Sequence, residues 1–231
     1  MIRFLAIVLI SQSICAVGQS SQLARYQTKF ENDVVAVYGV NLQAHASVPA
    51  FQSARDTFWV ALTDSSLSFT RQQGKTDIRW QAGDTRFFPS FETNVLSNRG
   101  TAEFRGVMIA LKPRSLISGA CGCAENTARA ICGCKGATHL EPLWALSLGE
   151  VTLAGTSLAA GESFRAAALR DDMLLVAVTD LDLTDLGSQD SESGERPVLH
   201  LKSGDAAWIP GGRHQFKNLD SAAVRFVTFE F

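Results

Sequence analysis

The sequence lacks an excess of basic residues, since 21 lysines and arginines stand against 23 aspartates and glutamates and give a formal net charge of −2. Without surplus positive charge to neutralise phosphates, a nucleic-acid partner has no electrostatic support. Heptad repeats, a collagen period and long helical periodicity are also missing, which excludes the fibrous classes. With 46% hydrophobic and only 19% charged residues, the 231-residue chain can nevertheless bury a core, so wholesale disorder is excluded.

Long apolar runs are absent as well, and the most apolar segment lies at the N-terminus. One arginine precedes an unbroken apolar run at residues 4–10, and small and polar residues follow it. This is the layout of a secretory signal peptide, and the run is far shorter than the ~20 residues that span a bilayer. Ala16 and Gly18 predict a signal peptide at residues 1–18 and a secreted or periplasmic mature chain with no further membrane contact. Cys15 leaves a lipid anchor as the alternative.

The rest of the sequence contains an internal repeat with two copies of one unit. Residues 60–64 (VALTD) recur as residues 176–180 (VAVTD), and the Gly-Asp pair at 83–84 recurs at 204–205. The additional residues of the second copy fall within residues 188–197, a stretch rich in Ser, Asp, Glu and Gly that is typical of a loop. Matches that keep the same order in both copies predict an internal structural repeat.

Each copy is expected to consist of short strands. Residues 35–42 alternate large apolar side chains with small or polar ones, and residues 104–111 form a further run of strand-forming residues. Turn residues recur every ~8–12 positions, which is the spacing of a β-sandwich or barrel. Strands without alternating helices predict an all-β chain with one barrel at residues 27–112, a linker at 113–140 and a second barrel at 141–231.

The segment from Gly204 to Asn218, GDAAWIPGGRHQFKN, resembles the second conserved motif of the cupin superfamily. It keeps the glycine, the spacing to Pro210 and the His-x-x-x-Asn ending that begins at His214, but it is one residue short between proline and histidine. The first copy keeps the glycine, the proline and the final asparagine and has Asn94 at the histidine position. The resemblance implies a bicupin, with two tandem double-stranded β-helix (jelly-roll) barrels that each have a cavity at the mouth.

The first cupin motif, which supplies most of the metal ligands in that family, is missing. The resemblance implies two histidines and a glutamate there, which bind a divalent metal together with the histidine of the second motif. The corresponding positions hold other residues: Ala167, Leu169 and Met173 or Leu174 in the second copy, and Phe51, Ser53 and Thr57 or Phe58 in the first. Only His214 remains, so we predict no metal and no other cofactor, which argues against dioxygenase and oxalate chemistry.

His214 is the centre of a candidate ligand-binding site. One interpretation places its imidazole at the mouth of a cavity, with Trp208 or Phe216 as an apolar wall. The other treats His214 as a structural histidine bonded to nearby backbone, because no acidic partner is evident in the sequence. Arg165, next to the vacant metal positions, could pair with a carboxylate or phosphate or simply be solvated. Asn94 is the counterpart of His214 in the first copy and a weaker candidate.

Four cysteines in the linker, Cys121, Cys123, Cys132 and Cys134, form two Cys-x-Cys pairs separated by eight residues. An even number of cysteines in an exported protein predicts disulfides. Because closure within one Cys-x-Cys pair is strained, pairing between the two is favoured, either nested (121–134 and 123–132) or parallel (121–132 and 123–134). The alternatives are a four-thiolate site for zinc or copper(I) and redox-active thiols.

Two classes of function remain open. The first is a small-molecule-binding or interaction module without catalysis, built on a scaffold that has lost its metal ligands. The second is a metal-independent or atypical-metal cupin enzyme that acts on a small carboxylate or sugar-like substrate and needs a histidine paired with a carboxylate or tyrosine. The fold hosts both classes. Since the two halves can cover each other's sheet edges, we expect a monomeric pseudo-dimer, with a homo-oligomer as the alternative.

Overall fold

A computed structural model describes residues 25–48, 55–71, 74–88, 95–112, 135–136, 144–148, 151–165, 172–187 and 198–231. The predicted signal peptide, the four linker cysteines and Asn94 lie outside these residues. All the regular secondary structure in the described part is β-strand, which confirms the all-β prediction. It follows that this part has no helix with the length and hydropathy to span a bilayer.

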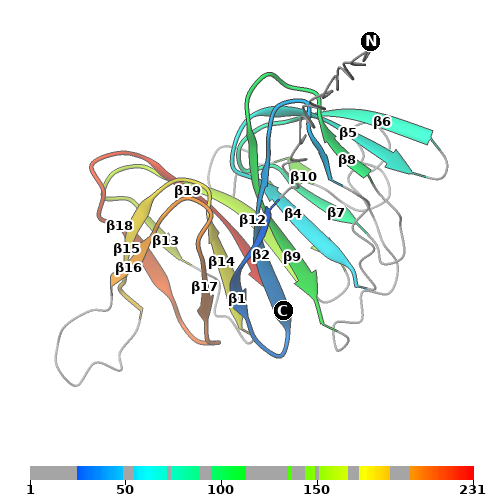
Figure 1. The fold of residues 1–231 in the computed structure, drawn as a ribbon. Helices are drawn as coiled ribbons and strands as arrows, with labels where there is room; N and C mark the ends of the chain where they lie inside the picture. The colour runs from blue at the N-terminus through cyan, green and yellow to red at the C-terminus, as the bar shows by residue number, and fades with distance from the viewer. Residues whose placement is uncertain are drawn as a thin grey trace, which may run out of the picture.

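The first half of the chain forms two antiparallel sheets that close into a barrel (Figure 1). A five-stranded sheet has the order β1-β2-β9-β4-β7, and a four-stranded sheet has the order β3-β8-β5-β6. The strands are β1 (Arg25–Glu31), β2 (Val35–Leu42), β3 (Ser47–Val48), β4 (Thr57–Ala61), β5 (Ser65–Arg71), β6 (Gly74–Trp80), β7 (Thr85–Phe88), β8 (Val95–Asn98) and β9 (Phe104–Leu111).

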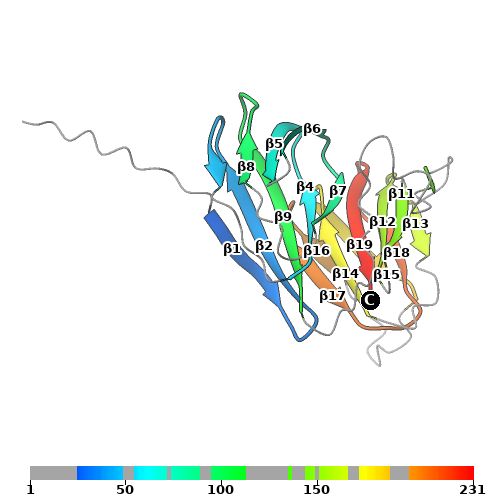
Figure 2. The same cartoon turned by 90° about the vertical axis from the view of Figure 1, so that its right-hand side faces the viewer.

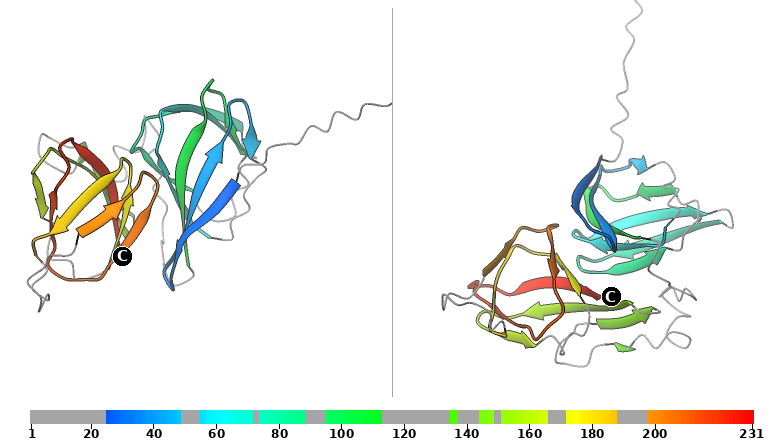
Figure 3. Two further views of the ribbon diagram at one scale, coloured as in Figure 1. Left: turned by 60° about the vertical axis from the view of Figure 1, so that its left-hand side comes forward. Right: turned by 90° about the horizontal axis from the view of Figure 1, so that it is seen from below.

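The second half repeats this topology. Its sheets have the orders β10-β11-β12-β19-β14-β17 and β13-β18-β15-β16, so five strands of the larger sheet and all four of the smaller one occupy the same places as strands of the first half. The strands are β10 (Lys135–Gly136), β11 (Trp144–Leu148), β12 (Val151–Leu158), β13 (Ser163–Arg165), β14 (Met173–Ala177), β15 (Leu181–Asp185), β16 (Val198–Leu201), β17 (Ala206–Ile209), β18 (Gln215–Asn218) and β19 (Val224–Glu230). The sequence repeat is therefore a repeat of fold, and Figure 3 shows the two barrels from two further directions.

The repeated motif residues hold equivalent turns. Gly83 and Gly204 have φ angles of 93° and 89°, a left-handed backbone that favours glycine over residues with a Cβ atom. Asn98 is 1% exposed, and its side-chain amide donates to the carbonyl of Ala102 at 2.7 Å, while its oxygen accepts from the Gly100 N–H at 2.9 Å. Asn218 makes the corresponding bonds in the second barrel. These residues fix how the last two strands of each barrel connect.

Side chains fill the interior of each barrel. The first contains an aromatic cluster in which Phe69 stacks on Phe88 at 4.9 Å and Trp80 lies 5.7 Å from Phe104, measured between ring centroids. The second has its own buried cluster of aliphatic and aromatic residues: Leu158, Met173, Leu175, Ala177, Leu181, Leu183, Ile209, Phe216, Val224 and Phe226.

The larger sheets of the two barrels lie next to each other (Figure 2), and a third apolar cluster joins them. It draws buried residues from both halves, and Phe58 of β4 lies 5.4 Å from Phe229 of β19. Polar contacts border it, since the guanidinium of Arg105 donates to the carbonyl of Ser203 at 3.3 Å. Arg225, the counterpart of Arg105 in the repeat, donates to the carbonyl of Ala82 in the opposite direction. The paired contacts indicate an approximate two-fold relation between the barrels.

Candidate functional site

His214 lies at the end of the turn that joins β17 to β18, so the motif forms a strand, a turn and a returning strand. The imidazole stacks on Phe216, with ring centroids 5.7 Å apart and planes inclined by 6°. Phe216 points into the second barrel, where it is 3% exposed. The structure therefore brings His214 and Phe216 together at the inner side of the barrel wall.

An acidic partner for His214 comes from the neighbouring strand. Asp185, the last residue of β15, places one carboxylate oxygen 2.6 Å from Nδ1 of His214. Its other oxygen accepts hydrogen bonds from the backbone N–H groups of Gln215 at 3.0 Å and Gly187 at 2.8 Å. The two side chains are only 14% and 10% exposed. Sequence analysis missed this pair, although Asp185 continues the inward-facing alternation of Leu181 and Leu183.

The electrostatics of Asp185 favour its ionised form. Burial raises the pKa of this carboxyl. Hydrogen bonds from His214, Gln215 and Gly187, together with the charge of His214, lower the pKa by more than burial raises it, so the net shift is downward. Nε2 of His214 lies 2.8 Å from the carbonyl oxygen of Pro210. Both ring nitrogens of His214 therefore lie within hydrogen-bond distance of an oxygen of the protein. In this arrangement both nitrogens are engaged by contacts within the chain, and a metal or a substrate would have to displace one of them.

The residues at the family's glutamate positions do not fit a metal either, while Ala167, Leu169, Phe51 and Ser53 at its histidine positions lie outside the described residues. Met173, at one of the two possible glutamate positions, is completely buried inside the second barrel, and Leu174 packs in the cluster between the barrels. The equivalent residues of the first barrel are Thr57, which is 4% exposed, and Phe58, which packs between the barrels. Within the described ranges, no three His, Cys, Asp or Glu side chains are grouped so that they could hold a metal ion.

The remaining site candidates lie apart from His214. Trp208 stacks on Phe231 at 5.5 Å and on Phe30 of the first barrel at 6.0 Å, so its ring packs on the side where the barrels meet. Its Nε1 donates to a carboxylate oxygen of Asp172 at 3.1 Å. The backbone of Arg165 pairs with Gln215, one residue from His214, while its side chain lies outside the described part, as does Asn94.

No family model matches the sequence, and a search of curated proteins finds no match. Solved structures do match over 90% of the chain. AerE from Microcystis aeruginosa aligns with a TM-score of 0.63 and 11% identity over 96% of its own chain. Vicilin from Corylus avellana (hazelnut) aligns with a TM-score of 0.60 and 11% identity over 83% of its chain. An oxalate decarboxylase from Bacillus subtilis gives a TM-score of 0.60 and 10% identity over 72% of its chain.

These similarities are too low in identity to carry function and show the fold alone. Together with a cupin 2 conserved barrel domain protein from Leptotrichia buccalis, which has a TM-score of 0.53, they confirm the resemblance to cupins. The chain has the cupin fold in its two-barrel form, which was the architecture predicted from the sequence motifs.

Proposed function

We propose that the protein is an exported bicupin that binds a small molecule without catalysis and without a metal in either barrel. The proposal rests on the contacts of the two ring nitrogens of His214. In a metal site this imidazole presents a free nitrogen to the ion, whereas here Asp185 and the Pro210 carbonyl occupy both nitrogens. Its role is to tie the turn after β17 to β15.

The filled interiors support the same proposal. Met173 contributes a buried thioether where a glutamate would face the ion, and the first barrel packs aromatic rings in the corresponding space. Among the described residues of the first barrel there is no equivalent His–Asp pair, because Phe69 stands at the position that Asp185 occupies in the second. The strand register shows that the two positions are equivalent, because Asp185 pairs with Phe216 of β18 and Phe69 pairs with Leu96 of β8. Ligand binding is therefore expected on the outer surfaces of the barrels.

The His–Asp pair favours one alternative, a metal-independent enzyme that acts on a small carboxylate or a sugar-like substrate. A carboxylate 2.6 Å from an imidazole can orient the ring and stabilise its charged form during general acid–base catalysis. Such a reaction requires Nε2 to leave the Pro210 carbonyl before it can exchange a proton with substrate. The described structure holds that nitrogen in place, and for that reason the binding module is preferred.

Elemental analysis tests the proposal. Purified wild type, His214→Ala and a variant with serine at all four linker cysteines are compared for transition metals per chain. We expect no stoichiometric metal in the barrels, so any bound metal should disappear with the cysteines and be unaffected by His214→Ala. Metal that is lost in His214→Ala but kept in the cysteine variant would refute the proposal and support a metalloenzyme.

A further inference from the structure

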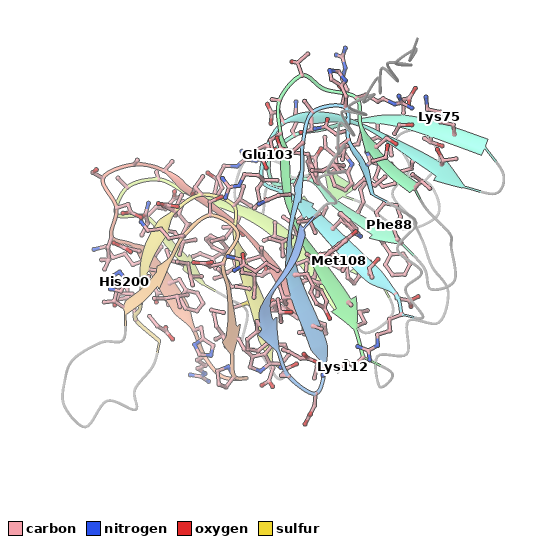
Figure 4. All side chains as sticks on the ribbon, in the orientation of Figure 1. Lys75, Phe88, Glu103, Met108, Lys112 and His200 are labelled. Carbon is pink, nitrogen blue, oxygen red and sulfur yellow. The ribbon has the colours of Figure 1, made fainter. Side chains whose placement is uncertain are left out.

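Two arginines that have no carboxylate partner among the described residues flank a serine on the outer face of the first barrel. In the four-stranded sheet, Ser66 of β5 pairs with Arg79 of β6. On its other side, Arg99 follows the last residue of β8, and its backbone N–H donates to the carbonyl of Ser66 at 2.7 Å. Arg99, Ser66 and Arg79 therefore form one row across three neighbouring segments, which we call the cationic row. Figure 4 labels Lys75, which lies on the same strand as Arg79.

The alternation of the strands places the cationic row on the solvent side. Leu67 and Trp80, the neighbours of Ser66 and Arg79, are buried in the barrel, whereas all three residues of the row are exposed. Adjacent strands lie about 4.8 Å apart, so the backbones of the two arginines are separated by roughly 10 Å. Both side chains are long enough to reach a single group above Ser66.

A hollow of about 470 Å³ lies over this part of the sheet. Its charged lining consists of Lys75, Asp77, Arg79 and Arg99, and Asp77 is paired with Lys75 at 3.6 Å. Within the described part of the chain, neither arginine has a carboxylate partner. The lining thus carries an excess of two positive charges on a chain whose formal net charge is −2. An unpaired cationic concavity of this kind favours an anionic ligand.

The second barrel shows that the fold does not require these charges. The equivalent row there consists of Leu219, Asp182 and His200, with the same backbone bond from Leu219 N–H to the Asp182 carbonyl at 2.9 Å. Nδ1 of His200 lies 2.7 Å from the Asp182 carboxylate, so the ionisable groups of this row pair with each other. The second barrel therefore has a row at the equivalent place, but that row contains no arginine.

A second hollow of about 350 Å³ adjoins the first and shares Ser66 and Arg79 with it. Its polar lining includes Ser65, Gln81, Thr101 and the carboxylate of Asp64, which accepts a hydrogen bond from the Ala82 N–H at 2.8 Å. Pockets for small molecules measure about 300–1,000 Å³ and orient their ligands through a few such groups. The pair of hollows thus offers a cationic end and a polar end where hydroxyl, amide and carboxylate groups can bond to the hydroxyl groups of a ligand.

We propose that the cationic row binds the oxyanion of a small polyhydroxylated molecule, such as a sugar phosphate or a sugar acid, whose hydroxyl groups occupy the adjoining hollow. Guanidinium groups match carboxylate and phosphate oxygens with two parallel hydrogen bonds, and two arginines can bind one such group from opposite sides. The inference rests on the proposed function as a binding module and places its ligand away from His214.

The test is a calorimetric titration of the full chain with glucose 6-phosphate, glucuronate, inorganic phosphate and glucose. We expect both sugar anions to bind saturably, phosphate to bind more weakly than glucose 6-phosphate, and glucose not to bind. Arg79→Gln and Arg99→Gln should each weaken glucose 6-phosphate binding by about tenfold or more, since each removes hydrogen bonds to a charged group. Arg213→Gln is the matched control, because it removes an equal charge from an exposed position of the second barrel and should leave affinity unchanged.

Three results would overturn the inference. These are the absence of saturable binding by either sugar anion, equal affinity for phosphate and glucose 6-phosphate, and a loss in Arg213→Gln as large as in the other variants. Thermal unfolding of each variant verifies that the exposed substitutions leave the fold intact. Metal analysis separates this inference from the proposed function, since a protein that is free of barrel metal but binds no sugar anion contradicts the cationic row alone.

Discussion

The buried His214–Asp185 pair should contribute measurably to stability, and Asp185→Ala tests this directly. The substitution removes the carboxylate that contacts His214, Gln215 and Gly187, and with it three hydrogen bonds. Hydrogen bonds to charged groups contribute about 1.5–3 kcal/mol, and breaking a fully buried ion pair costs about 3–5 kcal/mol. Since the two side chains retain 14% and 10% exposure, we expect a loss of about 2–3 kcal/mol in the free energy of unfolding. This corresponds to a fall in Tm of roughly 5–10 °C for a chain of this size.

The second barrel supplies its own control. His200 and Asp182 make the same kind of contact at 2.7 Å, but their side chains are 70% and 44% exposed. An exposed pair contributes less than about 1 kcal/mol, so Asp182→Ala should have a much smaller effect. Urea denaturation of wild type and both variants at pH 7 measures the difference. Equal losses in the two variants would refute the view that burial of the His214 pair stabilises the turn.

The pH dependence of the same variants gives an independent readout. The pKa of Asp185 in the folded protein lies below its usual value of 3.8, because hydrogen bonds and the charge of His214 outweigh the effect of burial. A carboxyl with a lowered pKa stabilises the folded state above its unfolded pKa, and that contribution is lost as the pH falls through the folded value. The gap in stability between wild type and Asp185→Ala should therefore be full at pH 5–6 and narrow below pH 3.8. A gap that widens on acidification would contradict the assignment.

Two further predictions concern the assembly of the chain. Phe229→Ala removes a fully buried ring from the cluster between the barrels and should cost about 3–5 kcal/mol, with both barrels still unfolding in one cooperative transition. The control is Leu219→Ala, at a residue that is 49% exposed, which should lower the free energy of unfolding by less than about 0.5 kcal/mol. Two separate unfolding transitions in Phe229→Ala would contradict the coupling of the barrels. Protein purified from an exporting host should begin at Gln19 and contain no free thiol, as N-terminal sequencing and thiol titration can measure; retention of residues 1–18 or four titratable thiols would refute export with disulfides.

The fold was predictable because its signals are local and occur twice. Strand periodicity and the turn residues lie within short segments. Gly204 acts through its own backbone conformation, and Asn218 bonds to Asp220 and Ala222 nearby in sequence, besides the distant carbonyls of Leu158 and Ala159. Two copies of the same signals in the same order then specify two similar barrels. Short-range patterns of this kind survive in a single sequence without any knowledge of long-range pairing.

The site was only partly predictable, because its contacts depend on register between distant strands. His214 and Phe216 belong to one motif and were found together, but Asp185 comes from another strand, 29 residues away in sequence. Trp208 was misplaced beside His214 as one of two possible walls, since alternation alone does not tell which face of a strand is turned inward. Ile209 faces the barrel interior, so Trp208 faces the other barrel. The cationic row likewise requires the pairing of Ser66 with Arg79.

What the two copies share and where they differ separates folding from function in this chain. The shared residues, Gly83 with Gly204 and Asn98 with Asn218, have positions that the backbone geometry of the turns explains completely. Their presence in both barrels is accounted for by folding and does not require chemistry at the barrel mouth. His214 is not shared, since the first copy has Asn94 in its place, but it too serves the fold, because its two nitrogens contact Asp185 of β15 and the Pro210 carbonyl. The rows centred on Ser66 and Asp182 occupy equivalent places yet differ in every side chain, and no feature of the fold demands the two unpaired arginines of the first. Because folding does not explain this arrangement of charges, it is the best candidate for a ligand-binding site in the described structure.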